Sequence, residues 1–472
     1  MAGEGTITHQ GVAIPGLDMS LYARRRQHHL TLPHPINKLP PELLAYIFIS
    51  VSEIDPPTTH GDDDQHSVSS ASSASSAGTP EGFNLGWIVV TQICGFWRTV
   101  AVCHPRLWVD ISPALTWSWA QVFLQRSRAV NLHIVRNVRI GAPEVLDIAA
   151  HIKHIAELDI TACPPLLSLW NEDETDIDDL SFDFLKRPAP CLRKLALREG
   201  AGIIWCNYVV FHNLLAGDAP CLREVTLHVH MIPWDSRIFQ NLTSLEIVLP
   251  EAMSYIEYVE RLTDAELRIL PPTLTQLVTI FAACASTLEV CKLDLGVLLL
   301  VDSQECNVEG LIHLEHLTTF DICMLPTNFA MLFDCIEVAP TAKFGVTLWG
   351  ARNDNDYLAI LPGLKRHVAR NSSASNPFTA LLVDIHAECT QLEVIFQTDS
   401  EAGEEIFIRM QYSENVEGPE GAKIIEWLNS FFATIPLETI TRLCFPIKKM
   451  PGQWDSFNGF PYLSAVHVLN VF

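Results

Sequence analysis

A short apolar pattern that returns along most of the chain is the feature that most constrains its fold. The segments "APCLRKLALRE" (189–199) and "APCLREVTLHV" (219–229) share five consecutive residues and begin thirty positions apart. Both carry the motif L-x-x-L-x-L or a conservative variant of it. Related segments lie at 154–161, 241–249, 287–295, 316–323, 341–349, 439–447 and 462–470. Such repetition predicts one supersecondary unit per copy, with each unit burying its apolar side chains against the next.

Alternation within the motif predicts which side chains face the interior. Successive side chains of a strand point to opposite faces of a sheet. We therefore expect Leu195 and Leu197 to face inward and Lys194 and Arg198 to face outward.

Helical patterns lie between several copies, for example at 274–286 and 422–435. A strand and a helix repeated every ~20–29 residues are the signature of leucine-rich repeats. The spacing here is longer and less even, which indicates insertions. We predict an α/β fold in which residues 113–472 form an irregular leucine-rich-repeat solenoid, with a parallel concave sheet and helices on the convex side. Residues 352–415 fit the period poorly, and strands such as "ALLVDIH" and "EIFIRMQ" are expected there in an irregular order.

The segment "INKLPPELLAYIFISVS" (36–52) predicts an amphipathic helix. Pro40 and Pro41 suit the first turn of a helix, where a missing N–H costs nothing. A single helix cannot cover its own apolar stripe, so it needs a partner within the chain or in another protein. That stripe has helical spacing and comprises Leu43, Leu44, Ile47, Phe48 and Val51.

A second helical stripe follows a Ser-rich, acidic segment. Residues 55–82 contain too little apolar material to order themselves, so we expect a disordered insertion there. Residues 1–33 are expected to form a flexible tail. The insertion thus interrupts one small helical unit, residues 34–112, rather than separating two domains. The second stripe, which Pro105 ends, comprises Val90, Ile93, Cys94, Trp97 and Ala101.

The two helical segments together resemble an F-box. "LPPELLAYIF" (39–48) has the Leu-Pro start and the Ile-Phe helix end of that family. "QICGFWRTVAVCHPRLWVDI" (92–111) has its Cys-x-x-Trp-Arg and Pro-x-Leu-Trp motifs. Ile93 replaces the usual Val before Cys94. The Ser-rich insertion is a larger departure, although many fungal F-box proteins resemble this chain in having a variable loop there.

The resemblance implies a partner and a function. An F-box docks onto a Skp-type adaptor, which links it to a cullin–RING ubiquitin ligase, while the C-terminal part captures the protein to be ubiquitinated. Trp97 either shares the adaptor contact or packs the helical core with Phe48, Cys94 and Trp108. The adaptor contact that the resemblance implies comprises Leu39, Pro40, Leu43, Leu44, Ile47 and Trp97.

Composition argues against several other classes of partner. The formal net charge is −24, and Arg24–Arg26 is the only basic cluster. Proteins that bind phosphate backbones need clustered Lys and Arg, so we expect neither nucleic acid nor a membrane to be a partner. No apolar run is long enough to span a bilayer. The thirteen cysteines form no CxxC pair and lie mostly in apolar patterns, which predicts buried reduced thiols in the cytoplasm or the nucleus.

The sequence contains no pattern typical of a catalytic, cofactor or metal site, so we expect a non-catalytic protein without a cofactor. His151-x-x-His154 and His313-x-x-His316 lack the Glu of H-E-x-x-H and are interpreted as surface or turn histidines. The acidic run 171–179 is interpreted as a solvated insertion on one repeat, with a contact for a basic partner as the alternative.

Outward-facing strand positions form the candidate surface for recognising an unknown target protein. Two hypotheses remain open: a substrate receptor of a ubiquitin ligase, or a leucine-rich-repeat scaffold or ligand-binding protein without a ubiquitin role, whose N-terminal helices only cap the repeats. In the second case the helix stripe must be covered by the first repeat. The candidate recognition residues are Lys194, Arg198, Glu224, His228, Glu246, Lys292, Asp294 and Asp321.

Overall fold

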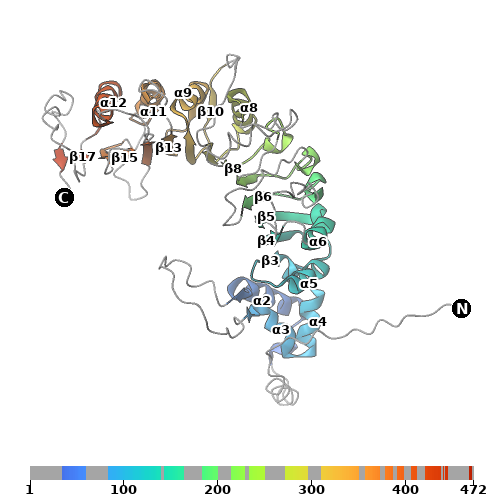
Figure 1. Cartoon of the computed structure of the whole chain (residues 1–472). Helices are drawn as coiled ribbons and strands as arrows, with labels where there is room; N and C mark the ends of the chain where they lie inside the picture. Colours follow the sequence, from blue (N-terminus) through green and yellow to red (C-terminus); the bar gives the residue numbers. More distant parts are fainter. Residues whose placement is uncertain are drawn as a thin grey trace, which may run out of the picture. The chain divides into compact units, whose positions relative to one another are not determined.

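The structure is a computed structural model in which the chain divides into two compact units, Met1–Val130 and Asn131–Phe472 (Figure 1). The helical unit therefore extends past the boundary predicted after residue 112. The predicted tail 1–33 and the acidic run 171–179 lie outside the described residues. Those residues are 35–59, 83–139, 143–163, 183–199, 214–228, 233–249, 272–295, 310–349, 357–372, 378–385, 391–397, 405–411, 420–436, 439–440, 442–444 and 467–469.

The first unit is mostly helical. Its elements are η1 (Pro35–Lys38), α2 (Pro41–Ile54), β1 (Thr58–Thr59), β2 (Phe83–Asn84), η3 (Gly86–Val89), α3 (Val90–Ile93), α4 (Gly95–Cys103), η4 (Pro105–Trp108), β3 (Asp110–Ile111) and α5 (Trp117–Ser127).

Helix α2 begins as its sequence predicts. Pro40 is the N-cap, Pro41 is the first helical residue and Glu42 lies in the first turn, where the helix dipole favours an anion. The predicted second helix is wrong in one respect. Cys94 is extended (φ −154°, ψ 166°), so the segment is broken into α3 and α4, and the Cys94 sulfur accepts a hydrogen bond from the backbone N–H of Trp97 at 3.5 Å.

The Ser-rich insertion begins later than predicted. Thr58 and Thr59 of β1 pair antiparallel with β2, so the start of the segment expected to be disordered is a strand. Gly86 follows with φ +51°, and a Cβ there would lie 2.5 Å from the carbonyl oxygen of Asp55. Only glycine suits both conditions. Residues 60–82 lie outside the described part of the chain.

Three aromatic rings form the centre of the helical unit. The ring centroids of Trp87 and Trp108 are 5.1 Å apart, and those of Trp108 and Phe123 are 5.0 Å apart. Trp108 donates a hydrogen bond from Nε1 to the Ala101 carbonyl at 2.8 Å. Because Phe123 belongs to α5, this helix is part of the same core, which explains why the unit continues to residue 130.

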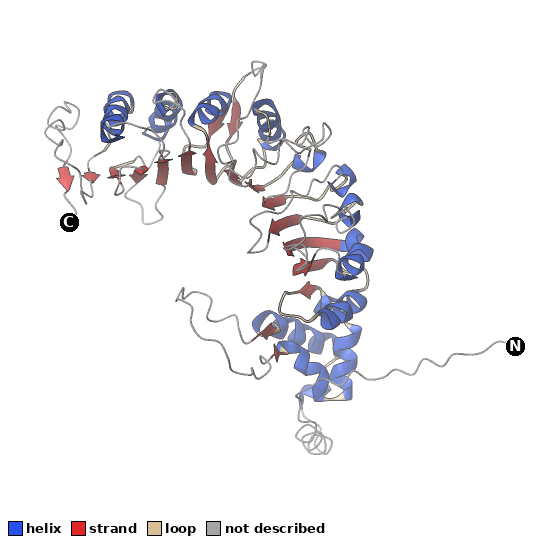
Figure 2. Cartoon of the chain, viewed as in Figure 1, coloured by secondary structure: helices blue, strands red, loops and turns tan. Residues whose placement is uncertain are grey.

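The second unit is built on a large, mostly parallel sheet, with helices along one face of it (Figure 2). The unit is thus α/β, and the described strands do not close into a barrel. Its strands in spatial order from β4 are β4 (Leu132–Arg139), β5 (Ile155–Cys163), β6 (Lys194–Glu199), β7 (Glu224–His228), β8 (Ser244–Val248), β9 (Val290–Asp294), β11 (Thr319–Met324), β13 (Lys343–Trp349), β16 (Glu405–Gln411), β15 (Gln391–Gln397), β14 (Ala380–Ile385), β17 (Arg442–Cys444) and β18 (His467–Leu469).

Helices lie between many of these strands. The helices predicted at 274–286 and 422–435 are confirmed as α8 and α12. A two-stranded parallel sheet, β10 (Ile312–Leu314) with β12 (Ile336–Val338), is separate from the large one. The helical elements are α6 (Pro143–His151), η5 (Ile152–His154), η6 (Asp183–Lys186), η7 (Leu214–Gly217), η8 (Arg237–Phe239), α8 (Leu274–Cys284), α9 (Pro326–Cys335), α11 (Leu361–Ser372) and α12 (Glu420–Thr434). In the described residues no helix is both long and apolar enough to cross a membrane.

The recurring motif produces the same structure in each copy from β6 to β11. Its first leucine lies in the turn before the strand, and the next two apolar positions point from the strand toward the helices. All three positions are buried in each copy from β6 to β11, with relative exposures of 2% or less. The buried triplets are Leu192, Leu195 and Leu197; Leu222, Val225 and Leu227; Leu242, Leu245 and Ile247; Leu288, Cys291 and Leu293; and Leu317, Phe320 and Ile322.

A ladder of backbone hydrogen bonds joins equivalent turns. In each one, a backbone N–H at or just before the start of a strand donates to a carbonyl near the start of the strand in the preceding copy, at 2.7–2.8 Å. The copies are unequal in length, from 20 residues (Arg223 to Thr243) to 46 (Thr243 to Glu289), yet the ladder is unbroken. Insertions must therefore lie outside the turn–strand segment. The ladder runs through Ala156, Arg193, Arg223, Thr243, Glu289, Thr318 and Lys343.

The irregular order predicted for 352–415 is also observed. Strand β16 pairs with β13, whereas β14 lies two strands further along, and β15 between them is antiparallel to both neighbours. "ALLVDIH" and "EIFIRMQ" form β14 and β16. Strand β15 was not predicted.

Candidate functional site

Helix α2 presents an apolar face that the helical unit does not bury. Leu43 is 50% exposed, Ile47 39% and Ile54 83%. At 100° per residue these three side chains fall within a narrow sector of the helix. Tyr46, 63% exposed, lies beside them. Exposed aliphatic residues that share one face are typical of protein–protein contacts.

The opposite side of α2 forms part of the core. Leu44 and Phe48 are fully buried, and the Phe48 ring lies 5.2 Å from that of Trp97 on α4. The assignment of Leu44 to the adaptor contact is therefore wrong, because its side chain is already covered within the chain. The wide stripe seen in the sequence is two adjacent faces with different surroundings.

The remaining residues predicted for the adaptor contact lie around the exposed face. Pro40 is exposed at the start of α2, and Leu39 before it is half-buried. Trp97 is half-buried against Phe48, so it belongs at least partly to the core. Phe48 and Trp108 are buried as predicted for residues that hold the helices together.

Further apolar side chains are exposed on the elements that follow the insertion. Val89, Ile93 and Phe96 are each about two-fifths exposed, at 38%, 43% and 40%. Ile93 was predicted to lie in the second helical stripe. The break at Cys94 changes the phase between α3 and α4, so a stripe drawn through both helices is not one face. The glycine at 95, directly after Cys94, was the available signal for this break.

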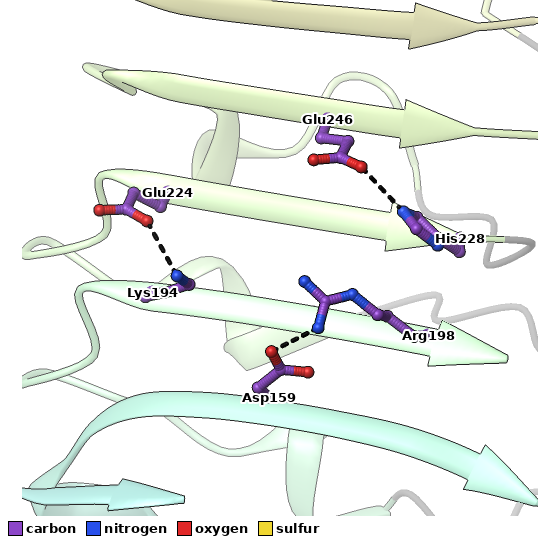
Figure 3. Close-up of polar contacts among 6 residues, drawn as sticks. All are labelled: Asp159, Lys194, Arg198, Glu224, His228 and Glu246. Carbon is purple, nitrogen blue, oxygen red and sulfur yellow. Dashed lines mark hydrogen bonds and ion pairs between the residues drawn. The ribbon is translucent and has the colours of Figure 1, made fainter. Parts of the chain in front are cut away.

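The candidate recognition residues of the second unit lie on the face of the sheet opposite the helices, and several pair across strands (Figure 3). Lys194 Nζ and Glu224 Oε2 are 3.4 Å apart, and His228 Nε2 and Glu246 Oε1 are 3.1 Å apart. The parallel register places Lys194 directly opposite Glu224. It places Glu246 opposite Thr226, two residues before His228 on β7, so the contact between His228 and Glu246 is diagonal.

Arg198 has a partner that the sequence did not reveal. Its NH1 lies 2.5 Å from Oδ2 of Asp159 on β5 (Figure 3). The Asp159 side chain is only 15% exposed, less than any other partner in these three pairs. Its position in "ELDIT", one residue after an inward-facing leucine, was a usable signal that it faces outward.

The other three candidates lie further along the same face. Lys292 is opposite Glu246 on one side and Asp321 on the other, and both Lys292 and Asp321 are exposed. Asp294 is half-buried opposite Val248 and Cys323. The face thus carries alternating charges rather than a single sign.

The histidine pairs form contacts within the chain. His151 Nδ1 lies 3.0 Å from His154 Nε2 at the end of α6, and burial lowers the pKa of both. His313 pairs with Glu337, and His316 lies in an exposed turn. Among the described residues, no group of three or more His, Cys, Asp or Glu side chains is placed to hold a metal ion.

The cysteines are less buried than predicted. Cys284 and Cys291 are buried, and burial raises the pKa of both thiols. Cys103 and Cys221 are exposed, so the prediction is wrong for them. Cys94, Cys191, Cys323 and Cys335 are half-buried, and none of these eight cysteines forms a disulfide.

Comparisons with known proteins add no relative. No protein-family model matches the chain, and neither the curated proteins nor the solved structures yield a match.

Proposed function

We propose that this protein is a non-catalytic substrate-recognition subunit of an SCF-type ubiquitin ligase. In this proposal the helical unit is an F-box that docks a Skp-type adaptor, and through it a cullin–RING ligase, by Leu39, Pro40, Leu43 and Ile47, with Trp97 at the edge. The second unit binds the target protein. The protein acts in the cytoplasm or the nucleus and raises the effective concentration of its target near the transferring enzyme.

The exposed face of α2 is the observation that carries the proposal. Leu43 and Ile47 occupy the positions that the F-box resemblance assigns to the adaptor, and both remain exposed although Leu44 and Phe48 beside them are buried. A helix needed only as core has no reason to keep large aliphatic side chains in water. Burying a leucine or isoleucine side chain contributes about 1.5–3 kcal/mol, so this face can supply substantial binding energy.

The repeated turn–strand units support the second half of the proposal. We infer that they form an irregular leucine-rich-repeat solenoid whose strand face meets the target. Buried motif leucines and the ladder of turn hydrogen bonds are features expected of such an array. The alternating charges on the strand face suit recognition of a protein, since charge complementarity gives specificity more than affinity.

A second function rests on the same repeats. The protein could be a leucine-rich-repeat scaffold or ligand-binding protein with no ubiquitin role, because the repeat features carry no information about the adaptor. The exposed apolar face of α2 favours the first proposal.

A pull-down with a purified Skp-type adaptor tests the proposal. The Leu43→Asp, Ile47→Asp double variant should lose adaptor binding while keeping the wild-type circular dichroism spectrum. The matched control is Leu146→Asp, Met331→Asp, which places the same charges on exposed apolar positions of α6 and α9. This control should bind like the wild type. A wild-type chain that does not bind the adaptor would leave the scaffold function, and a Leu43→Asp, Ile47→Asp variant that unfolds would assign these residues to core.

A further inference from the structure

Residues that are directly paired on successive strands form a row across the face of the sheet opposite the helices. Along this row the side chains change from charged to apolar. From β8 to β11 the row is charged, with Glu246, Lys292 and Asp321 directly opposite one another. Next comes Gly345 on β13. Directly paired residues of neighbouring strands point to the same face, so the row continues on that face into the antiparallel strands.

Beyond Gly345 the row becomes apolar. Phe407 on β16 is opposite Gly345, Ile395 on β15 is opposite Phe407, and Leu382 on β14 is opposite Ile395. All three side chains are partly exposed, whereas Ile406, Ile408 and their counterparts facing the helices are buried. We call Phe407, Ile395 and Leu382 the apolar patch. It lies where the irregular β14–β16 insertion enters the sheet.

An ion pair borders the patch. Arg409 Nε donates to Glu393 Oε1 at 2.8 Å, and the Arg409 guanidinium lies 4.9 Å from the centre of the Phe407 ring. The Arg409 guanidinium therefore lies over the Phe407 ring, while its charge is compensated by Glu393.

A carboxylate without an ion-pair partner among the described residues lies two strands from Phe407 in the same row. Asp321 is exposed, and within the part of the chain that the structure describes it makes no hydrogen bond or ion pair. A Cβ on Gly345 would lie 2.9 Å from Asp321 Oδ1, so the carboxylate extends over the glycine toward the patch. Because residue 345 has no side chain, the Asp321 carboxylate occupies the space beside it, next to the position of Phe407 in the row.

We propose that Asp321 and the apolar patch together bind a segment of another protein that carries a Lys or Arg near a bulky apolar side chain. The cation pairs with Asp321, and the apolar side chain covers Phe407, Ile395 and Leu382. This inference rests on the target-binding half of the proposed function and is independent of the adaptor. A basic target also matches the net charge of −24, which attracts cationic partners.

Sheet geometry sets the spacing in the target. Strands lie ~4.8 Å apart, so three strand steps from Asp321 to Ile395 cover ~14 Å. An extended peptide rises ~3.4 Å per residue and crosses that distance in about four residues. The expected motif is a basic residue three to five positions from a large apolar one.

Selection from a random 12-residue peptide library displayed on phage, with the full chain as bait, tests the proposal. Selected peptides should be enriched in this motif. Their affinity should fall at least tenfold for the Ile395→Thr, Phe407→Thr variant, in which threonine preserves strand propensity. Asp321→Asn should weaken binding several-fold and remove most of its salt dependence.

Val135→Thr is the matched control. Val135 is exposed on β4 and opposite Asp159, so it occupies the same row at the far end of the sheet. This variant should bind the peptides like the wild type. Equal binding by the patch variant, loss of binding by the control, or a selection without the motif would overturn the proposal.

Two further measurements complete the test. Sedimentation velocity of the wild type and the patch variant examines a second copy of the chain as occupant: a dimer that the patch variant loses would overturn the proposal, and a monomeric wild type supports it. The Leu43→Asp, Ile47→Asp variant should retain peptide binding. A failure of adaptor binding is thereby distinguished from a failure at the strand face.

Discussion

The helical unit exposes large apolar side chains, whereas many outward positions of the parallel strands carry polar or charged groups, and three pairs of them contact each other across strands. On α2, Leu43 and Ile47 face water although Leu44 and Phe48, one residue away, are buried. On the sheet, Lys194 and Arg198 each have a carboxylate partner on an adjacent strand. The first surface can gain energy by being covered, and the second can discriminate between partners by charge.

This difference indicates two kinds of contact. Covering an aliphatic face is favourable with any complementary apolar surface, which suits one constant partner. A charged face must first have its ion pairs exchanged or matched, so it accepts only targets with a suitable charge pattern. The apolar patch at Phe407 combines both properties at the end of the sheet.

The largest expected effect contrasts two neighbouring leucines of α2. Leu44→Ala should lower the free energy of unfolding of the helical unit by about 2–5 kcal/mol, because it leaves a cavity in a packed core. Leu43→Ala should change it by less than about 0.5 kcal/mol, since that side chain is half exposed. Urea denaturation followed by tryptophan fluorescence measures both. Equal losses would show that the two faces of α2 are not distinct.

The next effect concerns the core of the sheet unit, which contains a buried histidine. Burial, assisted by Arg370, lowers the pKa of His367 to about 4, and its ring stacks on Phe344 at 4.8 Å. The unfolded chain has a histidine pKa near ~6.5, so between these values the unfolded state binds more protons and stability falls as the pH falls. The loss due to His367 should reach about 3 kcal/mol at pH 4.

Comparison with His367→Phe isolates this contribution. The variant keeps an aromatic ring but cannot be protonated, so the wild type should lose stability relative to it between pH 6.5 and pH 4, and not above pH 7. Denaturation midpoints measured across this range provide the test. Parallel pH profiles for the two proteins would rule out a neutral, buried His367.

The smallest effect concerns the ion pairs of the strand face. A double-mutant cycle on Asp159 and Arg198 should give a coupling of about 0.5–1 kcal/mol that decreases with added salt. The same cycle on Lys194 and Glu224 should give a coupling of less than about 0.5 kcal/mol, because these two side chains are further apart and more exposed. A stronger coupling for the Lys194 pair would contradict the ranking by burial.

Much of the sheet could be predicted because its motif is local. The spacing of Leu192, Leu195 and Leu197 is enough to place a turn and a strand, and the inward positions are buried as expected. The partner of Arg198 could not be predicted, because Asp159 is 39 residues away and the pairing depends on which strands become neighbours. The same reason hid β15, whose antiparallel position depends on how β16 inserts beside β13.

The candidate helix face was only partly predictable. Periodicity groups Leu43 and Leu44 into one stripe because both are apolar and adjacent in angle. Which of the two leucines the core covers depends on how α4 packs against α2 through Phe48 and Trp97. That packing depends on the interruption of the helix at Cys94. Local sequence does not contain this information.

The two-stranded antiparallel sheet formed by β1 and β2 has a consequence for protein engineering. Because Thr59 pairs with Phe83, the chain leaves and rejoins the helical unit at adjacent points. Lengthening the segment between them twofold should cost only about 0.6 kcal/mol in closure entropy. A fluorescent reporter or affinity tag whose own ends lie close together can therefore be inserted between these strands, giving a labelled protein in which both chain ends remain native.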